Sequence, residues 1–465
     1  MQGYKKEWIS RLLFLLFAVQ PLLDVLSYWM QRVPSGSYLT LGLRFSILLF
    51  LCALGFLHTT RRRLYCTAAA GFAIFYLLHL LPSILSGGFS TNDILHDFTN
   101  YIRVLHLPAM TLALCSLLKA DDRGWNAIER GCLVALGFIT LIALLSRLTG
   151  TDPTSYPNKQ LGVLGWFYYA NSQSAILSAL VPLTLCAAVK RGKWAFPVVT
   201  LIGTALLFLL GTRLAYASAL AALFGTLISW LLCRKLNVLR SAVLIVCTLL
   251  CAAGYFISPM RQNQQLVAQN AEKKQQRIDA LVEQGRTEFP DDALAALGPA
   301  YEEYLGGLVD RFGLQRVADY YGRSTSASDL CDLRRAKRSY CELLLQNSSF
   351  MTRLFGLNYA DMEWQGVVYD VENDFHAIRY LYGWVGLGAL LLLLGCFVCR
   401  IVCALLQDAK GAFTMEVAAC GISLCTLTAH CYFTSGVLRR PNASVYLSLV
   451  LAGVWYYAGK VRKKQ

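Results

Sequence analysis

Long apolar runs alternate with short polar segments along most of the 465-residue chain. Each run has roughly 18–25 residues, which is enough for a helix to cross a hydrocarbon core about 30 Å thick. Backbone groups inside a bilayer must hydrogen-bond within the segment, and no strand-period alternation of the barrel kind is visible, so the pattern predicts helices. The predicted spans are residues 9–30, 38–57, 64–85, 101–118, 127–147, 168–189, 194–210, 213–233, 239–258, 378–399, 414–434 and 442–459.

One hydrophilic segment, residues 259–377, is much longer than the other polar segments. The pattern therefore predicts an all-α polytopic membrane protein with about twelve transmembrane helices and a helical extracytoplasmic loop domain. Residues 1–258 are expected to hold the first nine spans. Residues 378–465 are expected to hold the last three and a short cytoplasmic tail.

The long loop itself carries helical patterns. Residues 262–290 are polar and rich in Gln, Lys and Glu, which predicts an amphipathic helix that Pro290 ends. Residues 291–322 repeat apolar positions at helical spacing. After them, Ser328 or Asp329 is expected to cap a further helix that runs to about Leu345.

The composition supports a membrane protein, because 56% of the residues are hydrophobic and only 15% are charged. The net charge of +15 could indicate a nucleic-acid partner. However, the basic residues cluster in alternate short loops, as the positive-inside rule requires, so we expect cytoplasmic termini and no nucleic acid. The clustered residues are Lys5, Lys6, Arg11, Arg61, Arg62, Arg63, Lys119, Arg123, Lys190, Arg191, Lys193, Arg234, Lys235, Arg240, Arg400, Lys410, Arg462, Lys463 and Lys464. The intervening short loops hold only Arg32, Arg147, Lys159, Arg439 and Arg440.

Most of the sixteen cysteines lie in apolar runs, where cysteine behaves as a small hydrophobic residue. Cys331 and Cys341 differ, because both fall in the long loop. A disulfide between them is possible in an oxidising exterior. The sequence does not give the separation of their Cα atoms, on which such a bond depends.

Charged side chains inside spans are costly and by default mark functional sites. Asp24 lies inside the first predicted span, and Glu416 begins the eleventh. The predicted topology places a further group at the outer leaflet: Arg44, Arg103, Arg213, His430, Arg439 and Arg440. Several arginines facing one cavity would bind a diphosphate, because guanidinium binds phosphate oxygens bidentately and stays charged. Asp24 could pair with one of them. The alternative is that each arginine only extends to the outer headgroups.

Two motifs carry a family resemblance. Gly211–Ser218 (GTRLAYAS) leads directly into an apolar span, and Val371–His376 (VENDFH) is followed by Tyr380, Gly383 and Gly386 at the start of the tenth. With a large loop before the last three spans, the chain resembles the O-antigen ligase and O-antigen polymerase-like superfamily. The form of the second motif is similar to that of Gram-positive relatives.

The resemblance implies a GT-C-like architecture and a glycosyltransferase of cell-envelope polysaccharide biosynthesis. Members transfer a glycan from a polyprenyl diphosphate, usually undecaprenyl diphosphate, at the outer face of the cytoplasmic membrane. Ligases pass the glycan to an acceptor lipid or glycan, and polymerases pass it to another lipid-linked repeat. Members need no nucleotide sugar, no cofactor and typically no metal. The resemblance implies that Arg213 binds the diphosphate, and Arg44, Arg103 and Arg439 are expected to assist it.

Glu372 is the first candidate for the base that accepts the proton of the acceptor hydroxyl, with Asp374 and His376 behind it. Many ligases have a His-Asn pair where this chain has Glu372-Asn373. That difference leaves open which residue does the acid–base work. Residues 372–374 could also be a helix cap, in which acids are favoured by the helix dipole. His376 could be a packing residue at the interface.

Two other functions are compatible with such a chain. A lipid-linked oligosaccharide flippase should show charged or broken helices near the midplane and often two related halves. Here the polar residues concentrate at one leaflet, and nine spans before the loop with three after it are not two halves, which favours the enzyme. A non-catalytic scaffold would leave the outer arginines unexplained. The sugar, the acceptor and the choice between ligase and polymerase do not follow from the sequence.

Overall fold

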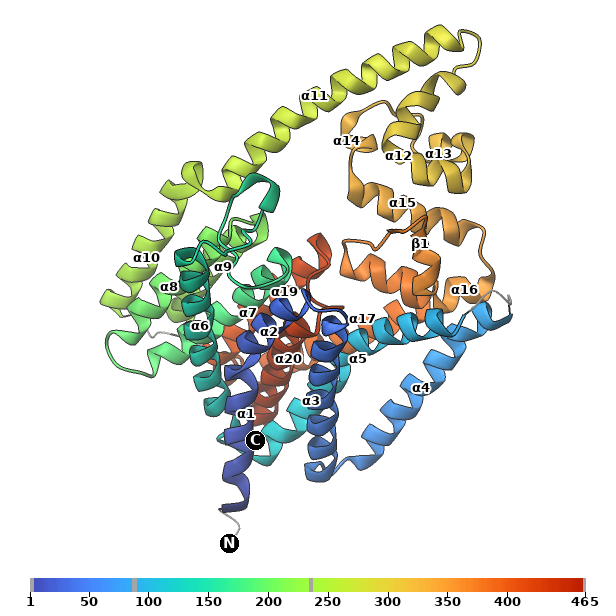
Figure 1. The fold of residues 1–465 in the computed structure, drawn as a ribbon. Helices are drawn as coiled ribbons and strands as arrows, with labels where there is room; N and C mark the ends of the chain where they lie inside the picture. The colour runs from blue at the N-terminus through green and yellow to red at the C-terminus, as the bar shows by residue number, and fades with distance from the viewer. Residues whose placement is uncertain (1–3, 86–89, 234–236, 463–465) are drawn as a thin grey trace. The chain divides into compact units, whose positions relative to one another are not determined.

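The computed structural model describes residues 4–85, 90–233 and 237–462, and these residues are helical almost throughout (Figure 1). The first helices are α1 (Tyr4–Ala18), α2 (Gln20–Met30), α3 (Gly36–His58), α4 (Arg62–Leu85), α5 (Thr91–Ala120), α6 (Gly124–Leu148), the 3-10 turn η1 (Pro157–Lys159), α7 (Ala170–Val189), α8 (Ala195–Leu210), α9 (Arg213–Leu232), α10 (Val238–Ala253) and the 3-10 turn η2 (Gly254–Ile257). The later elements are α11 (Pro259–Glu288), η3 (Ala295–Leu297), α12 (Gly298–Phe312), α13 (Leu314–Tyr320), α14 (Ala327–Leu330), α15 (Leu333–Gln346), α16 (Phe350–Phe355), η4 (Tyr359–Met362), β1 (Glu363–Trp364), β2 (Val367–Val368), α17 (Asp374–Gln407), α18 (Ala409–Ala412), α19 (Met415–Phe433) and α20 (Pro441–Arg462).

Within the described residues, eight helices are long and apolar enough to cross a membrane. The pair α1 and α2, bent by 42°, makes a ninth if it is one span. These helices confirm the predicted all-α polytopic membrane protein. All twelve predicted spans are helical over most of their length. However, α8 has only 16 residues, and α19 and α20 are not among the eight, so the count of twelve stays a prediction.

The chain forms two compact units. The first unit, called here the membrane unit, contains Met1–Ala70, Tyr101–Gln262 and Leu391–Gln465. The second, called here the loop unit, contains Gly71–Asn100 and Asn263–Leu390. The basic residues Arg234, Lys235, Lys463 and Lys464 of the predicted topology lie outside the described residues.

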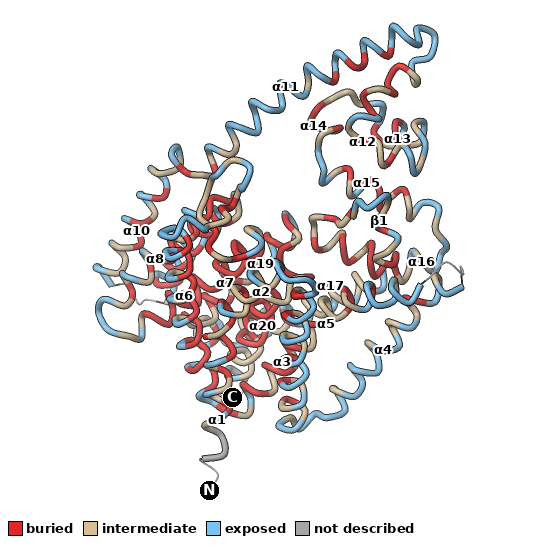
Figure 2. The backbone as a smooth tube through the Cα atoms, in the orientation of Figure 1, coloured by how far each residue is buried: buried red, intermediate tan, exposed pale blue. Residues whose placement is uncertain are grey.

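Helix α7 is the central helix of the membrane unit and packs against α6, α8, α9, α19 and α20. Its apolar window is 94% buried, and buried residues gather on it and its neighbours (Figure 2). Small residues let these helices approach closely, and hydroxyls bond between them. Ser423 of α19 donates to the carbonyl of Ala179 at 2.8 Å, and Thr426 donates to that of Ser178 at 3.3 Å. The polar start of α7 therefore faces protein rather than lipid.

The loop unit confirms the predicted polar helix, because α11 ends at Glu288, two residues before Pro290. The helical pattern of residues 291–322 divides into η3, α12 and α13, with a break at Gly313. The sequence did not predict the hairpin of β1 and β2, in which Glu363 pairs with Val368. Its turn residues Gln365 and Gly366 both have positive φ, as a tight two-residue hairpin turn requires.

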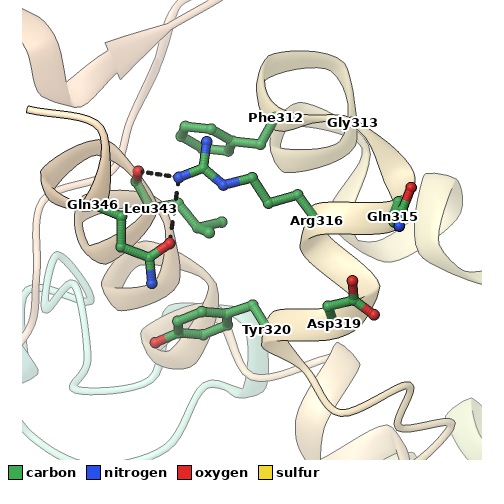
Figure 3. Close-up of a pocket in the computed structure, with 8 residues that line it drawn as sticks. All are labelled: Phe312, Gly313, Gln315, Arg316, Asp319, Tyr320, Leu343 and Gln346. Carbon is green, nitrogen blue, oxygen red and sulfur yellow. Dashed lines mark hydrogen bonds between the residues drawn. The ribbon is translucent and has the colours of Figure 1, made fainter.

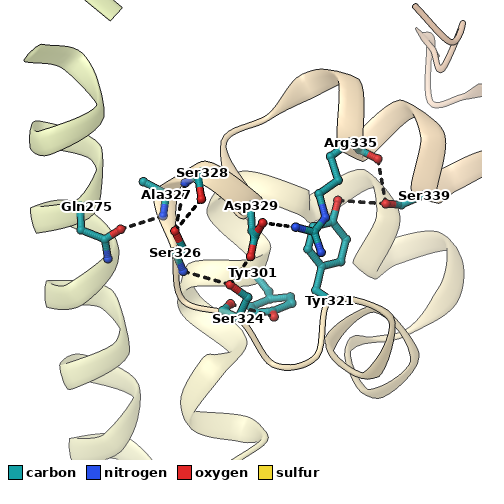
Figure 4. A network of polar contacts seen from close by, with 10 residues as sticks. All are labelled: Gln275, Tyr301, Tyr321, Ser324, Ser326, Ala327, Ser328, Asp329, Arg335 and Ser339. Carbon is teal, nitrogen blue, oxygen red and sulfur yellow. Dashed lines mark hydrogen bonds and ion pairs between the residues drawn. The ribbon is translucent and has the colours of Figure 1, made fainter. Parts of the chain in front are cut away.

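The predicted cap at Ser328 or Asp329 was wrong. Ser326 caps the short α14, and Asp332 caps α15 by accepting from the backbone N–H of Arg334 at 2.9 Å. Asp329 is used differently: its carboxylate pairs with Arg335 and accepts a hydrogen bond from Ser324 (Figure 4). A carboxylate held by a tertiary ion pair is not available for local capping.

Cys331 and Cys341 are both free thiols, so the possible disulfide between them is not formed. Cys341 is buried, and its Sγ lies 3.6 Å from the carbonyl oxygen of Tyr369.

Candidate functional site

The turn between α8 and α9 presents the first motif. Gly211 ends α8 with a left-handed backbone (φ 73°), and a Cβ atom there would lie 2.6 Å from the Cβ atom of Pro259. Only glycine combines this conformation with so close an approach. Thr212 is extended, and its hydroxyl oxygen caps α9 by accepting from the backbone N–H of Ala215 at 3.1 Å. Arg213 is the first residue of α9, so the turn defines where its side chain starts.

The side chain of Arg213 is exposed, and no residue that the structure describes forms a hydrogen bond or an ion pair with it. Arg440, by contrast, lies 3.9 Å over the ring of Tyr169. The N-terminus of a helix carries a partial positive charge and unpaired backbone N–H groups. Arg213 therefore combines a guanidinium with donors to spare and a helix N-terminus, which together suit an anion.

A buried polar network supports this turn from α7 and α19. The hydroxyl of Thr212 donates to Ser174 Oγ at 3.0 Å. Nε2 of His430 lies 3.1 Å from Ser178 Oγ and 3.4 Å from Ser174 Oγ, with direction set by the histidine tautomer. His430 is buried, so it acts here through the hydroxyl network rather than as an open cation at the outer leaflet.

The other arginines of the predicted diphosphate site are less open than Arg213. Arg44 is nearly buried and pairs with Asp24 at 2.6 Å, which confirms that Asp24 pairs with one of the arginines. It also donates to Gln20 Oε1 at 3.2 Å. Arg439 is buried and Arg103 is half-buried. The charge of Arg44 is thus already balanced, and a joint role of these arginines with Arg213 stays a prediction.

The second motif forms the start of α17, and Asn373 is its cap. The Oδ1 atom of Asn373 accepts from the backbone N–H of His376 at 3.0 Å, as the capping interpretation of residues 372–374 expected. Asp374 is the first residue of α17 and is fully buried. His376 is half-buried, and its ring stacks on that of Tyr380 with centroids 6.2 Å apart.

Glu372 lies just before this helix, and two cations of α15 hold its carboxylate. Arg334 Nε lies 2.7 Å from Oε2, and Lys337 Nζ lies 3.7 Å from Oε1. The Glu372 side chain is 31% exposed, so part of it remains open. The sequence did not predict that these two cations pair with Glu372.

Glu342 is a polar residue of this region that the sequence did not single out. Its carboxylate accepts hydrogen bonds from the hydroxyl of Tyr320, from the hydroxyl of Tyr380 at 2.8 Å and from Arg338 Nε at 3.1 Å. Burial tends to raise the pKa of Glu342, but these three bonds outweigh it and hold the pKa below its ordinary value. The only local signal was the spacing of Arg338 and Glu342 on one helix face.

Gly383 interrupts α17 nine residues after its start. Its backbone has φ 63° and ψ −166°, a region open essentially only to glycine. A Cβ atom there would lie 2.2 Å from the carbonyl oxygen of Leu354. The break therefore separates the motif-bearing start of α17 from the apolar length that follows it.

A metal site is conceivable at one place among the described residues. Ligand atoms of Glu129, Cys186 and Glu416 lie within 4.8 Å of one another. However, Lys190 Nζ lies 2.7 Å from Glu129 Oε1 and 2.8 Å from Glu416 Oε1. The ammonium group contacts both carboxylates and balances one of their two negative charges, so these residues fit a buried ion-pair cluster better than a metal centre.

The candidate residues divide between the two units. Arg213, Arg44, Arg103 and Arg439 belong to the membrane unit, and the Glu372–His376 motif belongs to the loop unit. Among known proteins, a family model described as O-antigen ligase like membrane protein matches residues 6–458, which is nearly the whole chain. No curated protein matches the chain. The match confirms the resemblance and indicates a glycosyltransferase-type membrane enzyme of surface polysaccharide synthesis.

Proposed function

The chain belongs to the O-antigen ligase like membrane proteins, and we propose that it transfers a glycan from a polyprenyl diphosphate, such as undecaprenyl diphosphate, to an acceptor. The acceptor is a lipid or glycan in a ligase, or another lipid-linked repeat in a polymerase. The reaction takes place at the outer face of the cytoplasmic membrane. The observation that carries the proposal is the open guanidinium of Arg213 at the start of α9.

A diphosphate leaving group gains negative charge as its bond to the sugar breaks. Preorganised positive groups that face this charge stabilise the transition state. Arg213 suits the task because it binds phosphate oxygens bidentately, stays charged, and stands at a helix N-terminus. Arg44, which is balanced by Asp24, would contribute less charge. Since Arg213 supplies the positive charge, we expect the reaction to be independent of metal and transfer to continue in EDTA. Loss of transfer on chelation would refute metal independence.

In the proposed reaction the acceptor hydroxyl oxygen attacks the anomeric carbon. The bond from that carbon to the diphosphate oxygen breaks, and the lipid diphosphate leaves with the bonding electrons. The hydroxyl proton passes to Glu372, whose side chain is partly open and is oriented by Arg334 and Lys337. A single displacement of this kind inverts the anomeric centre. His376 is the second candidate base, and the buried Asp374 would act by positioning the start of α17.

The orientation in this proposal rests on the distribution of basic residues. Alternate short loops rich in Lys and Arg support cytoplasmic termini, as the positive-inside rule expects. Residues 259–377 are then extracytoplasmic, and so is the Glu372 motif within them. The turn at Arg213 falls on the same side of the membrane, because an odd number of predicted spans precedes it.

The test is a transfer assay in proteoliposomes with a polyprenyl-diphosphate-linked glycan and its acceptor. We expect Arg213→Ala and Glu372→Gln each to lower kcat/KM by about 10²-fold or more, since charge stabilisation and proton transfer each contribute on this scale. Arg147→Ala is the matched control, because Arg147 is also exposed and is predicted on the same membrane side. Full transfer by both site variants would refute the assignment. If labelled lipid-linked glycan instead crossed the bilayer without transfer, the protein would be a flippase.

A further inference from the structure

The loop unit contains an open pocket of about 560 Å³, called here the α13 pocket (Figure 3). It lies along α13, between the end of α12 and the end of α15. The side chains that give it its character are Phe312, Gln315, Arg316, Asp319, Tyr320 and Gln346. Its volume is within the usual range for small-molecule sites, about 300–1,000 Å³.

The chemistry of this lining narrows the class of ligand. One arginine and one aspartate balance each other in charge, which disfavours a phosphate or another simple anion. Two glutamines add groups that both donate and accept hydrogen bonds. Two aromatic rings offer flat apolar faces. A ligand that uses all of these at once is neutral, rich in hydroxyl groups and apolar on one face, which describes a sugar ring.

The donors of the α13 pocket are held in place before any ligand arrives. Arg316 Nη2 donates to the carbonyl of Leu343 at 2.9 Å and to Gln346 Oε1 at 3.3 Å. The guanidinium carbon lies 5.6 Å from the ring centre of Phe312. Within the described part of the chain, no residue accepts from Nε or Nη1 of Arg316. These donors can therefore bind hydroxyl oxygens with little loss of side-chain freedom.

The pocket is also joined to the candidate catalytic segment. Tyr320 lines the pocket, and its hydroxyl donates to Oε2 of Glu342. The other carboxylate oxygen of Glu342 accepts from Tyr380, which stacks on His376 at the start of α17. One carboxylate thus connects the pocket wall to the VENDFH motif, and both belong to the same compact unit.

We propose that the α13 pocket is a glycan-binding subsite that holds a sugar unit of the substrate away from the bond that is made or broken. This inference rests on the proposed glycan transfer. The sugar unit belongs either to the donor glycan or to the acceptor, and both present the same chemistry to the pocket. Binding at such a subsite would align the reacting end of the glycan without touching it.

The probe is a set of two- to four-residue oligosaccharides released by mild acid from the host's own surface polysaccharide. Their binding to the full-length protein in nanodiscs is measured by saturation-transfer NMR. We expect Arg316→Met and Asp319→Ala each to weaken binding about tenfold, as the loss of a charge-assisted hydrogen bond does. Arg286→Met and Asp310→Ala are matched controls, since both residues are exposed in the loop unit outside the pocket, and they should bind as the wild type.

Kinetics then identify the source of the sugar. A rise in KM for the acceptor alone, with kcat kept within about twofold, assigns the subsite to the acceptor glycan, and a rise for the donor alone assigns it to the donor. Thermal unfolding midpoints of Arg316→Met and Asp319→Ala confirm that the loop unit stays folded. Wild-type binding and KM in both variants would overturn the subsite while leaving the role of Arg213 intact. Fragment binding that depends on the pocket, in a protein without transfer activity, would instead overturn the proposed function alone.

Discussion

The break in α17 at Gly383 gives a stability prediction whose size follows from backbone geometry. Its φ of 63° and ψ of −166° lie in a region that costs a non-glycine residue about 1–3 kcal/mol. An added Cβ atom would also lie 2.2 Å from the carbonyl oxygen of Leu354 and 2.6 Å from the backbone nitrogen of Phe355. Backbone atoms cannot turn aside, so the segments must shift, and overpacking adds about 1–3 kcal/mol. We expect Gly383→Ala to lower the free energy of unfolding by about 2–6 kcal/mol.

The measurement is urea unfolding of the detergent-solubilised protein, followed by tryptophan fluorescence, because Trp384 adjoins the break. Gly388→Ala is the control in the same helix. A Cβ atom there meets nothing within 4 Å, and alanine favours a helix over glycine by about 0.8–1.0 kcal/mol. This control should therefore unfold at the wild-type midpoint or slightly above it. If Gly383→Ala behaved like Gly388→Ala, the left-handed break would not be part of the folded protein.

Three further predictions follow from buried or half-buried charges. Hydrogen bonds lower the pKa of Glu342 in the folded state, so the stabilisation by its carboxylate is complete above its ordinary pKa of about 4.3 and is lost as the pH falls through the folded pKa. When the free energy of unfolding is measured over a pH series, Glu342→Gln should lose less stability than the wild type between about pH 5 and pH 3. Breaking the pair of Asp24 and Arg44 by Asp24→Leu should lower the free energy of unfolding by about 3–5 kcal/mol. The double variant Asp24→Leu with Arg44→Met should recover most of this loss in the same unfolding assay. Equal losses in the single and the double variant would argue against a buried pair. Asp97→Ala should lower the free energy of unfolding by about 2–5 kcal/mol, because the carboxylate accepts from a backbone N–H at 3.1 Å and contacts His79 Nε2 at 3.1 Å. Unchanged hydrogen exchange around His79 would contradict this.

The sequence predicted the parts of this protein that depend on local composition. Apolar run length alone located the helices of the predicted spans, because a segment in lipid must satisfy its backbone groups internally. The polar helix α11 and its end before Pro290 followed from composition and from the restrictions of proline. The pairing of Asp24 followed from the cost of leaving a charge unpaired within a span.

The tertiary contacts of the loop unit were not predictable in this way. His79 Nδ1 lies 2.7 Å from the carbonyl oxygen of Phe355, across 276 positions of sequence. Glu342 gains its role only because Tyr320 and Tyr380 converge on it from two other helices. Asp329 had the right residue type and place for a cap, but an ion pair with another helix engaged it instead. For His79 and for the two tyrosines that contact Glu342, the partner is set by the fold and not by neighbours in sequence.

The burial of α7 has a consequence for how the protein is made. A ribosome releases α7 long before α19 and α20, yet these last helices cover a large part of its surface. Hydroxyl groups of α19 also donate hydrogen bonds to two backbone carbonyls of α7. Until they arrive, the polar start of α7 has no permanent protein neighbour on that side. Assembly of the membrane unit is therefore completed from the C-terminal end. A chain that stops before residue 414 would leave α7 facing lipid or the insertion machinery, and should be cleared by membrane proteases rather than accumulate as a partial enzyme.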